Sequence, residues 1–237
     1  MDAQSFEIKY RFTLPDNSVE TMDLRIDSNS LNLLNELPKP LPSWTMLGFH
    51  QCSNCPLQAQ NTPICPVASR LVQILPSCNK LISYDEVDVE VTTSERKISV
   101  HTKAEMAISS MMGLIFASSG CPHMSFFKPM ARFHLPFSTQ EETLFRATGT
   151  YLLGQYLRQR QGHTPDFTLE GLETIYDEIK EVNRSVAARL RAAAKTDSAL
   201  NALVLLDIHA QVLPFALKNF LDKLDYLFVP FWMSQCR

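Results

Sequence analysis

Three cysteines lie close together in one stretch of the sequence. Two residues separate Cys52 from Cys55, and nine residues separate Cys55 from Cys65. Two thiolates at the C-x2-C spacing can bind the same metal ion, and the chain between Cys55 and Cys65 is long enough to turn back. The pattern therefore predicts a metal site that includes Cys52, Cys55 and Cys65.

The remaining ligand comes from a different part of the chain. Cys121 is the main candidate, and the alternates are His50, Cys78 and His123. A mixed set of thiolates and imidazole would indicate zinc, whereas four thiolates would also suit an iron–sulfur cluster. Unligated cysteines are often small buried apolar residues, so a metal-free core remains the alternative interpretation.

A second group of candidate residues follows Cys121 in the sequence. His123, Arg132 and His134 are the candidate catalytic residues, and the alternation of apolar and polar residues around the last two predicts an extended segment. In that conformation Arg132 and His134 share one face. They could hold an anionic substrate while a histidine moves a proton. The alternative is a segment that covers the core with its polar face in water.

The overall composition excludes several classes of protein. The 237 residues include 22 Lys and Arg against 25 Asp and Glu, a formal net charge of -3, which gives no electrostatic footprint for nucleic acid. No P-loop, Rossmann, G-x-S-x-G or H-E-x-x-H motif is present in the sequence. The sequence names no reaction, and whether the protein is an enzyme stays open.

The N-terminal residues and the hydropathy pattern bear on location. The first residues lack the basic start and apolar run of a secretory signal, and the apolar stretch 106–117 is too short to span a bilayer. We therefore expect a cytoplasmic protein without a membrane partner. In that reducing compartment, cysteines serve as thiols or metal ligands more often than as disulfides.

The N-terminal half shows strand signals on either side of a proline-rich segment. Alternating residues predict one β-hairpin over 6–27 and a second over 86–100. Between them, residues 38–66 contain six prolines and all three clustered cysteines, so this segment is expected to be a loop. A short helix is expected over 67–75.

Helix signals dominate from residue 104 onward. The first expected helix is apolar nearly all round and ends at Gly120, and a capping box of Ser138 and Glu141 starts another that ends near Gly162. Residues 168–195 have the pattern of an amphipathic helix. Two more helices are expected in 197–227, with a break near Pro214.

These elements predict an α+β fold. The expected β-rich part with the cysteine loop covers residues 1–103, and the mostly helical part covers residues 104–237; the two could also form one continuous domain.

Several runs of sequence resemble one protein family. HQCSNCPL, ICPVA, SGCPHMSFFKPMARFHLPF and TYLLGQYL are similar to a family of uncharacterised bacterial proteins, with the resemblance covering roughly residues 7–160. The resemblance implies no known activity or catalytic role. It supports the interpretation that the two cysteine-containing segments belong to one structural unit.

The main hypothesis is a cytosolic metal-binding protein with a thiolate-rich site, of a regulatory or sensory kind. One alternative is a metal-assisted enzyme acting on an anionic small molecule, with His123, Arg132 and His134 near the metal. The other is a metal-free protein that binds a protein partner through its C-terminal helices. An exposed apolar patch within residues 197–233 would favour this last alternative.

Overall fold

The computed structural model describes residues 4–219 and 221–235 and shows an α+β fold, as predicted. Four antiparallel strands form one sheet in the order β2-β1-β3-β4. The strands are β1 (Ser5–Thr13), β2 (Val19–Asp27), β3 (Glu86–Thr92) and β4 (Lys97–Lys103). Both predicted hairpins are therefore present, and they meet through the pairing of β1 with β3.

Alternation along the strands gives the sheet one buried face. Ile8, Tyr10 and Phe12 of β1 are all buried, and Tyr10 lies opposite Val91 of β3, which is buried too. The residues that alternate with Ile8, Tyr10 and Phe12 along β1 point to the other, polar face of the sheet. The sheet therefore adds a single apolar face to the core.

The proline-rich segment between the hairpins is mostly irregular, as expected. It contains the short 3₁₀ helix η1 (Ser43–Thr45) and ends at α1 (Pro66–Leu71). The single helix expected over 67–75 is instead two, because α2 (Leu75–Cys78) starts separately with Pro76 in its first turn. Proline lacks the N–H that a continuing helix would need at this position.

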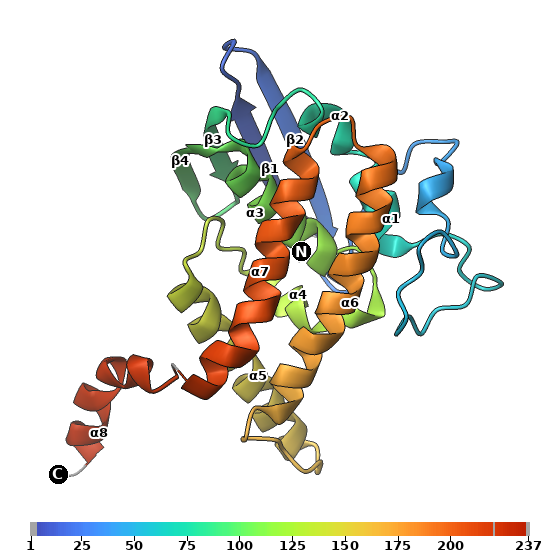
Figure 1. Ribbon diagram of the computed structural model, residues 1–237. Helices are drawn as coiled ribbons and strands as arrows, with labels where there is room; N and C mark the ends of the chain where they lie inside the picture. Colours follow the sequence, from blue (N-terminus) through green and yellow to red (C-terminus); the bar gives the residue numbers. More distant parts are fainter. Residues whose placement is uncertain (1–3, 220, 236–237) are drawn as a thin grey trace.

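Three helices pack side by side, and the last of them in sequence lies in the middle. The buried helix α3 (Ala104–Ala117) begins directly after β4 and contacts α7 (Ser198–Asn219), which lies beside α6 (Glu170–Ala193) (Figure 1). Buried residues from the sheet and from these helices belong to one hydrophobic core. The predicted boundary at 103/104 is thus a direct strand-to-helix junction with Lys103 as the N-cap of α3.

The start of α5 (Gln140–Arg160) differs by one residue from the prediction. Thr139, rather than Ser138, is the N-cap: its side chain accepts a hydrogen bond from the Glu142 backbone N–H. The Glu142 carboxylate in turn accepts from the Thr139 N–H at 2.7 Å. The capping box is real but is formed by Thr139 and Glu142.

The segment around Arg132 is not extended, so the prediction that Arg132 and His134 share one face of a strand is wrong. The 3₁₀ helix η2 (Pro122–Phe127) leads into α4 (Lys128–Arg132), and His134 follows the end of α4. Pro129 sits in the first turn of α4, where proline favours a helix start. The Arg132 guanidinium lies over the Phe6 ring, 4.6 Å from its centroid.

The break expected near Pro214 is absent, because α7 runs through this proline to Asn219. Pro214 cannot donate to the carbonyl four residues earlier, yet α7 packs against both α3 and α6. We attribute the continuity of the helix to that packing. The chain then forms η3 (Leu221–Leu227) and α8 (Val229–Gln235), which project from the body (Figure 1).

One helix in the described chain is long and apolar enough to cross a bilayer by length and composition. This stretch of α7, Ser198–Leu217, is partly buried against its neighbours, and core helices of soluble proteins meet the same criterion. Residues Ala104–Ala117 and Pro122–Arg132 meet it together only as a pair bent by 109°. The sequence prediction of no membrane partner stays a prediction.

Candidate functional site

Helix α6 carries a buried arginine that holds the proline-rich segment. The Arg189 guanidinium is 1% exposed and donates to the carbonyls of Trp44, Met46 and Leu47 at 2.7, 2.8 and 2.9 Å. Carbonyls in an irregular buried segment need donors from elsewhere, because no ladder or helix supplies them. Arg189 therefore fixes the segment just before the clustered cysteines.

Further polar groups of α6 hold the next residues of the segment. The Ser185 hydroxyl donates to the His50 carbonyl and also hydrogen-bonds the Cys52 thiol. Ser53 donates to the Glu181 carboxylate at 3.0 Å, and the Asn54 side chain donates to the backbone carbonyl of Glu178 at 3.2 Å. The turn from Cys52 to Cys55 thus lies against α6.

Backbone pairing brings the third cysteine back to this turn. The Cys65 N–H donates to the Thr45 carbonyl at 2.8 Å, and Met46 forms an antiparallel bridge with Ile64. Within the turn, the Cys55 N–H donates to the Cys52 carbonyl at 3.1 Å. The chain between Cys55 and Cys65 therefore turns back, as the spacing predicted.

Cys121 reaches the same region from the other side. It is the N-cap of η2, immediately after α3, and its N–H donates to the Ser119 hydroxyl at 3.2 Å. Two residues later, the His123 ring donates from Nε2 to the Asn54 carbonyl at 2.9 Å, and its Nδ1 lies 3.0 Å from the Glu178 carboxylate. Both ring nitrogens thus have partners, and His123 joins η2 to the cysteine turn and to α6.

Electrostatic interactions connect the four thiols in pairs. The pKa of the Cys121 thiol is raised to about 11, mainly by burial and to a smaller extent by Cys65 and Cys52. Burial also raises the pKa of Cys52, with added contributions from Cys65 and Cys55, while the Ser185 hydrogen bond and the Arg189 charge oppose them. These pairwise interactions link Cys52, Cys55, Cys65 and Cys121, which we call the thiol cluster.

The alternate ligands have other partners. The Cys78 thiol is buried in α2, which raises its pKa to about 12, and the Cys78 carbonyl accepts from Ser198 at the start of α7. His50 is exposed, with its ring edge against Phe49. The sixth cysteine of the sequence, Cys236, lies outside the described residues.

The candidate catalytic residues after α4 contact a different part of the molecule. Nε2 of His134 lies 2.6 Å from the Tyr10 hydroxyl, which in turn lies 3.0 Å from the Ser110 hydroxyl. Burial, together with the Arg146 charge, lowers the pKa of His134 to about 3, so this ring is neutral. Since Arg132 packs on Phe6, both residues face β1 and α3. A site shared by these residues and the thiol cluster stays a prediction.

The side chains do not stand in metal-ligand geometry. Among residues 4–219 and 221–235, no group of three or more His, Cys, Asp or Glu side chains is arranged to hold a metal ion. Two buried polar atoms of this region, Nε of Arg189 and Oδ1 of Asn54, have no hydrogen-bond partner within the described chain. The side chains of the thiol cluster would therefore have to rotate before their sulfur atoms could coordinate one metal centre.

The residues that organise this site were not predicted from the sequence. Arg189 and Ser185 lie one turn apart on the buried side of α6, beside Val182 and Val186. A charged residue within the apolar stripe of a helix indicates a buried polar partner elsewhere in the protein. Arg189 is such a residue, and its position in the stripe is the signal that could have identified it from the sequence.

Fold and site together define an α+β protein with a partly buried cluster of four thiols. The chain belongs to the family described as a domain of unknown function, DUF6901, whose model matches residues 8–229. The match includes every member of the thiol cluster and extends well beyond the range expected from the resemblance. No curated protein and no solved structure matched the chain.

The raised thiol pKa values give a pH prediction. In chelator-treated protein, alkylation of Cys121 by iodoacetamide should rise toward about pH 11, whereas in urea it should follow a free thiol, with a pKa of about 8.5. The neutral thiol stabilises the fold at low pH, and that contribution is lost as the pH rises between these two values. Peptide mass spectrometry across the pH range measures this, and identical native and urea profiles would contradict it.

Proposed function

We propose that this protein binds a metal centre through Cys52, Cys55, Cys65 and Cys121. The observation that carries the proposal is that Cys121, the N-cap of η2, interacts electrostatically with Cys52 and Cys65 of the proline-rich segment. Burying four thiols from two distant segments is compatible with a plain core. However, a C-x2-C turn held by polar contacts from α6 is the arrangement that a shared ligand set would need.

The donor chemistry supports a ligand set made of sulfur. His123 already uses both ring nitrogens, and His50 is exposed, so four thiolates are the natural donors. Four thiolates suit a structural zinc ion or an iron–sulfur cluster. Zinc or an iron–sulfur cluster is therefore the proposed cofactor, and the metal content of the purified protein distinguishes them.

The charge around the thiol cluster also supports the proposal. A metal centre with four thiolates carries net negative charge, which is costly to bury without a compensating cation. Arg189 is buried, its charge already lowers the pKa of Cys52, and no carboxylate in the described chain pairs with it. The Nε–H of Arg189 has no hydrogen-bond partner within the described chain and could donate a hydrogen bond to a metal-bound thiolate.

Metal binding would have to displace protons from thiols that the fold keeps neutral. The free energy of the metal–sulfur bonds must exceed that cost, so binding should weaken as the pH falls. The side chains of the thiol cluster would turn inward at the same time. In this proposal the metal fastens the proline-rich segment to α6 and η2.

A regulatory or sensory role in the cytosol follows from the same arrangement. If the metal ties the proline-rich segment to α6, its loss would release a segment of this length from the body. A reducing compartment keeps the thiols available for such reversible binding. Both location and role are parts of the proposal.

Metal analysis of the untagged protein, purified without oxygen, tests the proposal. We expect close to one zinc or several irons per chain, and Cys52→Ser or Cys121→Ser should remove most of the metal and lower the melting temperature. Cys78→Ala is the matched control, because Cys78 is buried in α2 and should leave the metal content unchanged.

Two results would contradict the proposal. One is wild-type protein that contains neither metal and binds neither on reconstitution. The other is loss of metal in Cys78→Ala to the same extent as in Cys121→Ser, which would show general destabilisation.

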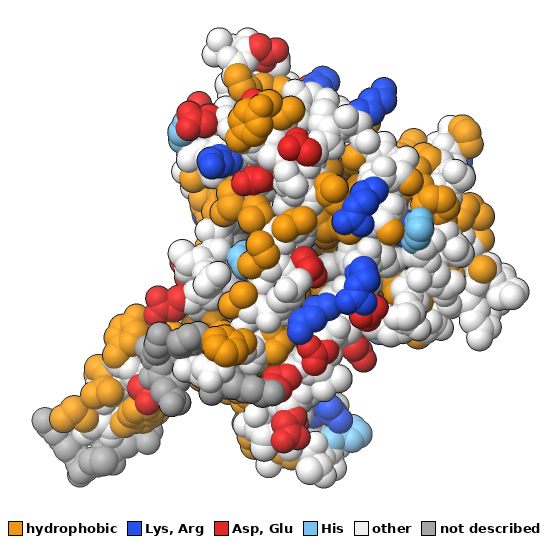
Figure 2. Space-filling model, in the orientation of Figure 1, with side chains coloured by type: hydrophobic (Ala, Val, Ile, Leu, Met, Phe, Trp, Pro, Cys, Tyr) orange, Lys and Arg blue, Asp and Glu red, His pale blue; other side chains and the backbone are white. Residues whose placement is uncertain are grey.

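A second candidate function, self-association through the C-terminal segment, is favoured by one surface. Large apolar side chains are exposed along the projecting segment, and Figure 2 shows them gathered there. They are Tyr226, Leu227, Phe228, Val229, Phe231, Trp232 and Met233. A second copy of the chain is the proposed occupant, because in a two-fold dimer the same apolar patch can cover itself.

Sedimentation velocity at several concentrations checks this second candidate. Wild-type protein should dimerise, and the double change Phe231→Ser with Trp232→Ser should shift it to monomer, because both side chains are exposed and apolar. Tyr84→Ser is the control, since Tyr84 is 68% exposed on another part of the surface. A wild-type monomer at all concentrations would contradict the candidate.

A further inference from the structure

A cavity lies between the helices, on the side of α3 that faces α5 and α7. Its volume is about 350 Å³, and α3, α4, α5, α6 and α7 all contribute to its wall. The lining is largely apolar and includes Gly113, Leu114, Met130 and Leu206. Cavities of about 300–1,000 Å³ with apolar walls and a few polar groups are typical of small-molecule sites.

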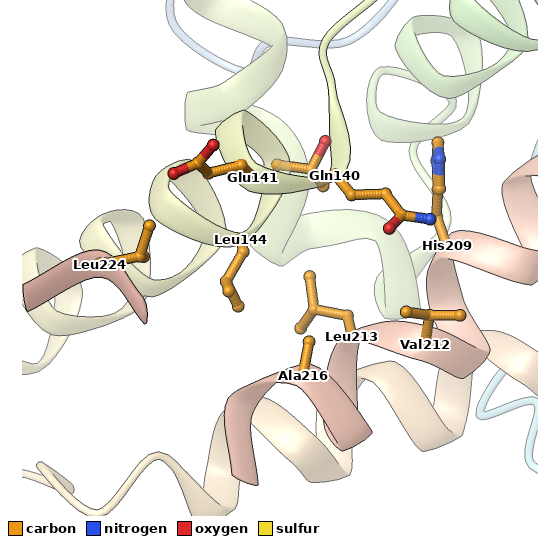
Figure 3. Close-up of a pocket in the computed structure, with 9 residues that line it drawn as sticks. Gln140, Glu141, Leu144, His209, Val212, Leu213, Ala216 and Leu224 are labelled. Carbon is orange, nitrogen blue, oxygen red and sulfur yellow. The ribbon is translucent and has the colours of Figure 1, made fainter. Parts of the chain in front are cut away.

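A second hollow adjoins this cavity. It has a volume of about 390 Å³ and lies between the first turns of α5, the second half of α7 and η3 (Figure 3). Leu144, Leu213, Ala216 and Leu224 form its apolar wall. Glu141 also lines this hollow, and its carboxylate accepts a hydrogen bond from the Tyr226 hydroxyl at 3.1 Å. The two spaces share the polar wall residues Gln140, Thr143 and His209, so they adjoin each other, and we call the two together the elongated apolar space.

The wall of the cavity contains one permanently charged group, Arg146 of α5. Its Nη2 donates to the carbonyls of Met130 and Phe133, both at 3.0 Å. Within the described chain no carboxylate hydrogen-bonds the Arg146 guanidinium; the nearest charge effect comes from Glu142, one turn earlier, whose carboxylate accepts from the Thr139 N–H and partly offsets the effect of burial on Arg146. Burial lowers the pKa of Arg146, which shows that its charge is poorly solvated.

The other titratable groups of the wall are neutral or already paired. His134 is neutral because burial and the Arg146 charge lower its pKa to about 3. Burial also lowers the pKa of His209. Tyr176 is buried in α6, and Asn183 donates to the Asp207 carboxylate at 3.1 Å. A guanidinium with unused donors is thus the group best suited to an anionic ligand head.

We infer that this cavity binds an amphiphile with an unbranched apolar chain and a carboxylate head. The chain would lie in the elongated apolar space, and the carboxylate would pair with Arg146. The inference does not depend on the thiol cluster, because none of its four cysteines lines the cavity.

Calorimetric titration of the full-length protein with decanoate and with decan-1-ol tests the inference. Wild-type protein should bind decanoate about tenfold more tightly than the alcohol, the order expected for one charge-assisted contact. Arg146→Gln should abolish this preference. Gly113→Leu should weaken both ligands about tenfold, because its side chain would enter the cavity, where a Cβ at Gly113 lies 3.5 Å from Leu206.

Gly149→Leu is the matched control, because a Cβ at Gly149 meets nothing within 4 Å. It makes the same change in a helix and should leave both affinities unchanged. The inference is overturned if wild-type protein binds neither ligand below micelle-forming concentrations, or if Gly113→Leu binds decanoate as wild type does. A decanoate preference that survives in folded Arg146→Gln overturns the proposed head-group contact. If Arg146→Gln does not fold, the two glycine variants decide.

Discussion

The buried guanidinium of Arg189 is the contact on which the candidate site depends. It holds the carbonyls of Trp44, Met46 and Leu47 in the proline-rich segment to α6, and hydrogen bonds to a charged donor contribute about 1.5–3 kcal/mol each. The segment has few helices or strands to satisfy its own backbone, so these bonds decide where it lies. Once it is fixed, Ser185 and His123 can bind the turn that carries Cys52 and Cys55.

Burial has opposite consequences for the ionisable groups of the thiol cluster and of the cavity. In the thiol cluster, burial raises the pKa of the sulfurs and keeps them protonated, so a metal must compete with protons for them. In the cavity, burial leaves the Arg146 charge short of solvent and so favours an anion. Helix α6 contributes to both, through Arg189 on one side and Tyr176 on the other.

Local patterns predicted the hairpins and the amphipathic helix α6, because period-two and helical repeats depend on neighbours in sequence. The grouping of Cys52, Cys55 and Cys65 as ligands of one metal stays a prediction. The extended segment around Arg132 and the break near Pro214 were predicted wrongly, since Pro129 starts a helix there and Pro214 lies within a helix held by tertiary packing. Arg189 could not be assigned from sequence, because its carbonyl partners belong to an irregular segment far away in the chain.

X-ray absorption at the metal edge of protein purified without oxygen tests the central claim most directly. The account predicts a sulfur-only first coordination shell, at about 2.3 Å if the metal is zinc. It also predicts that the sulfur signal falls when Cys121, which comes from outside the proline-rich segment, is changed to serine. A shell of nitrogen and oxygen, or a sulfur signal that does not depend on Cys121, would contradict it.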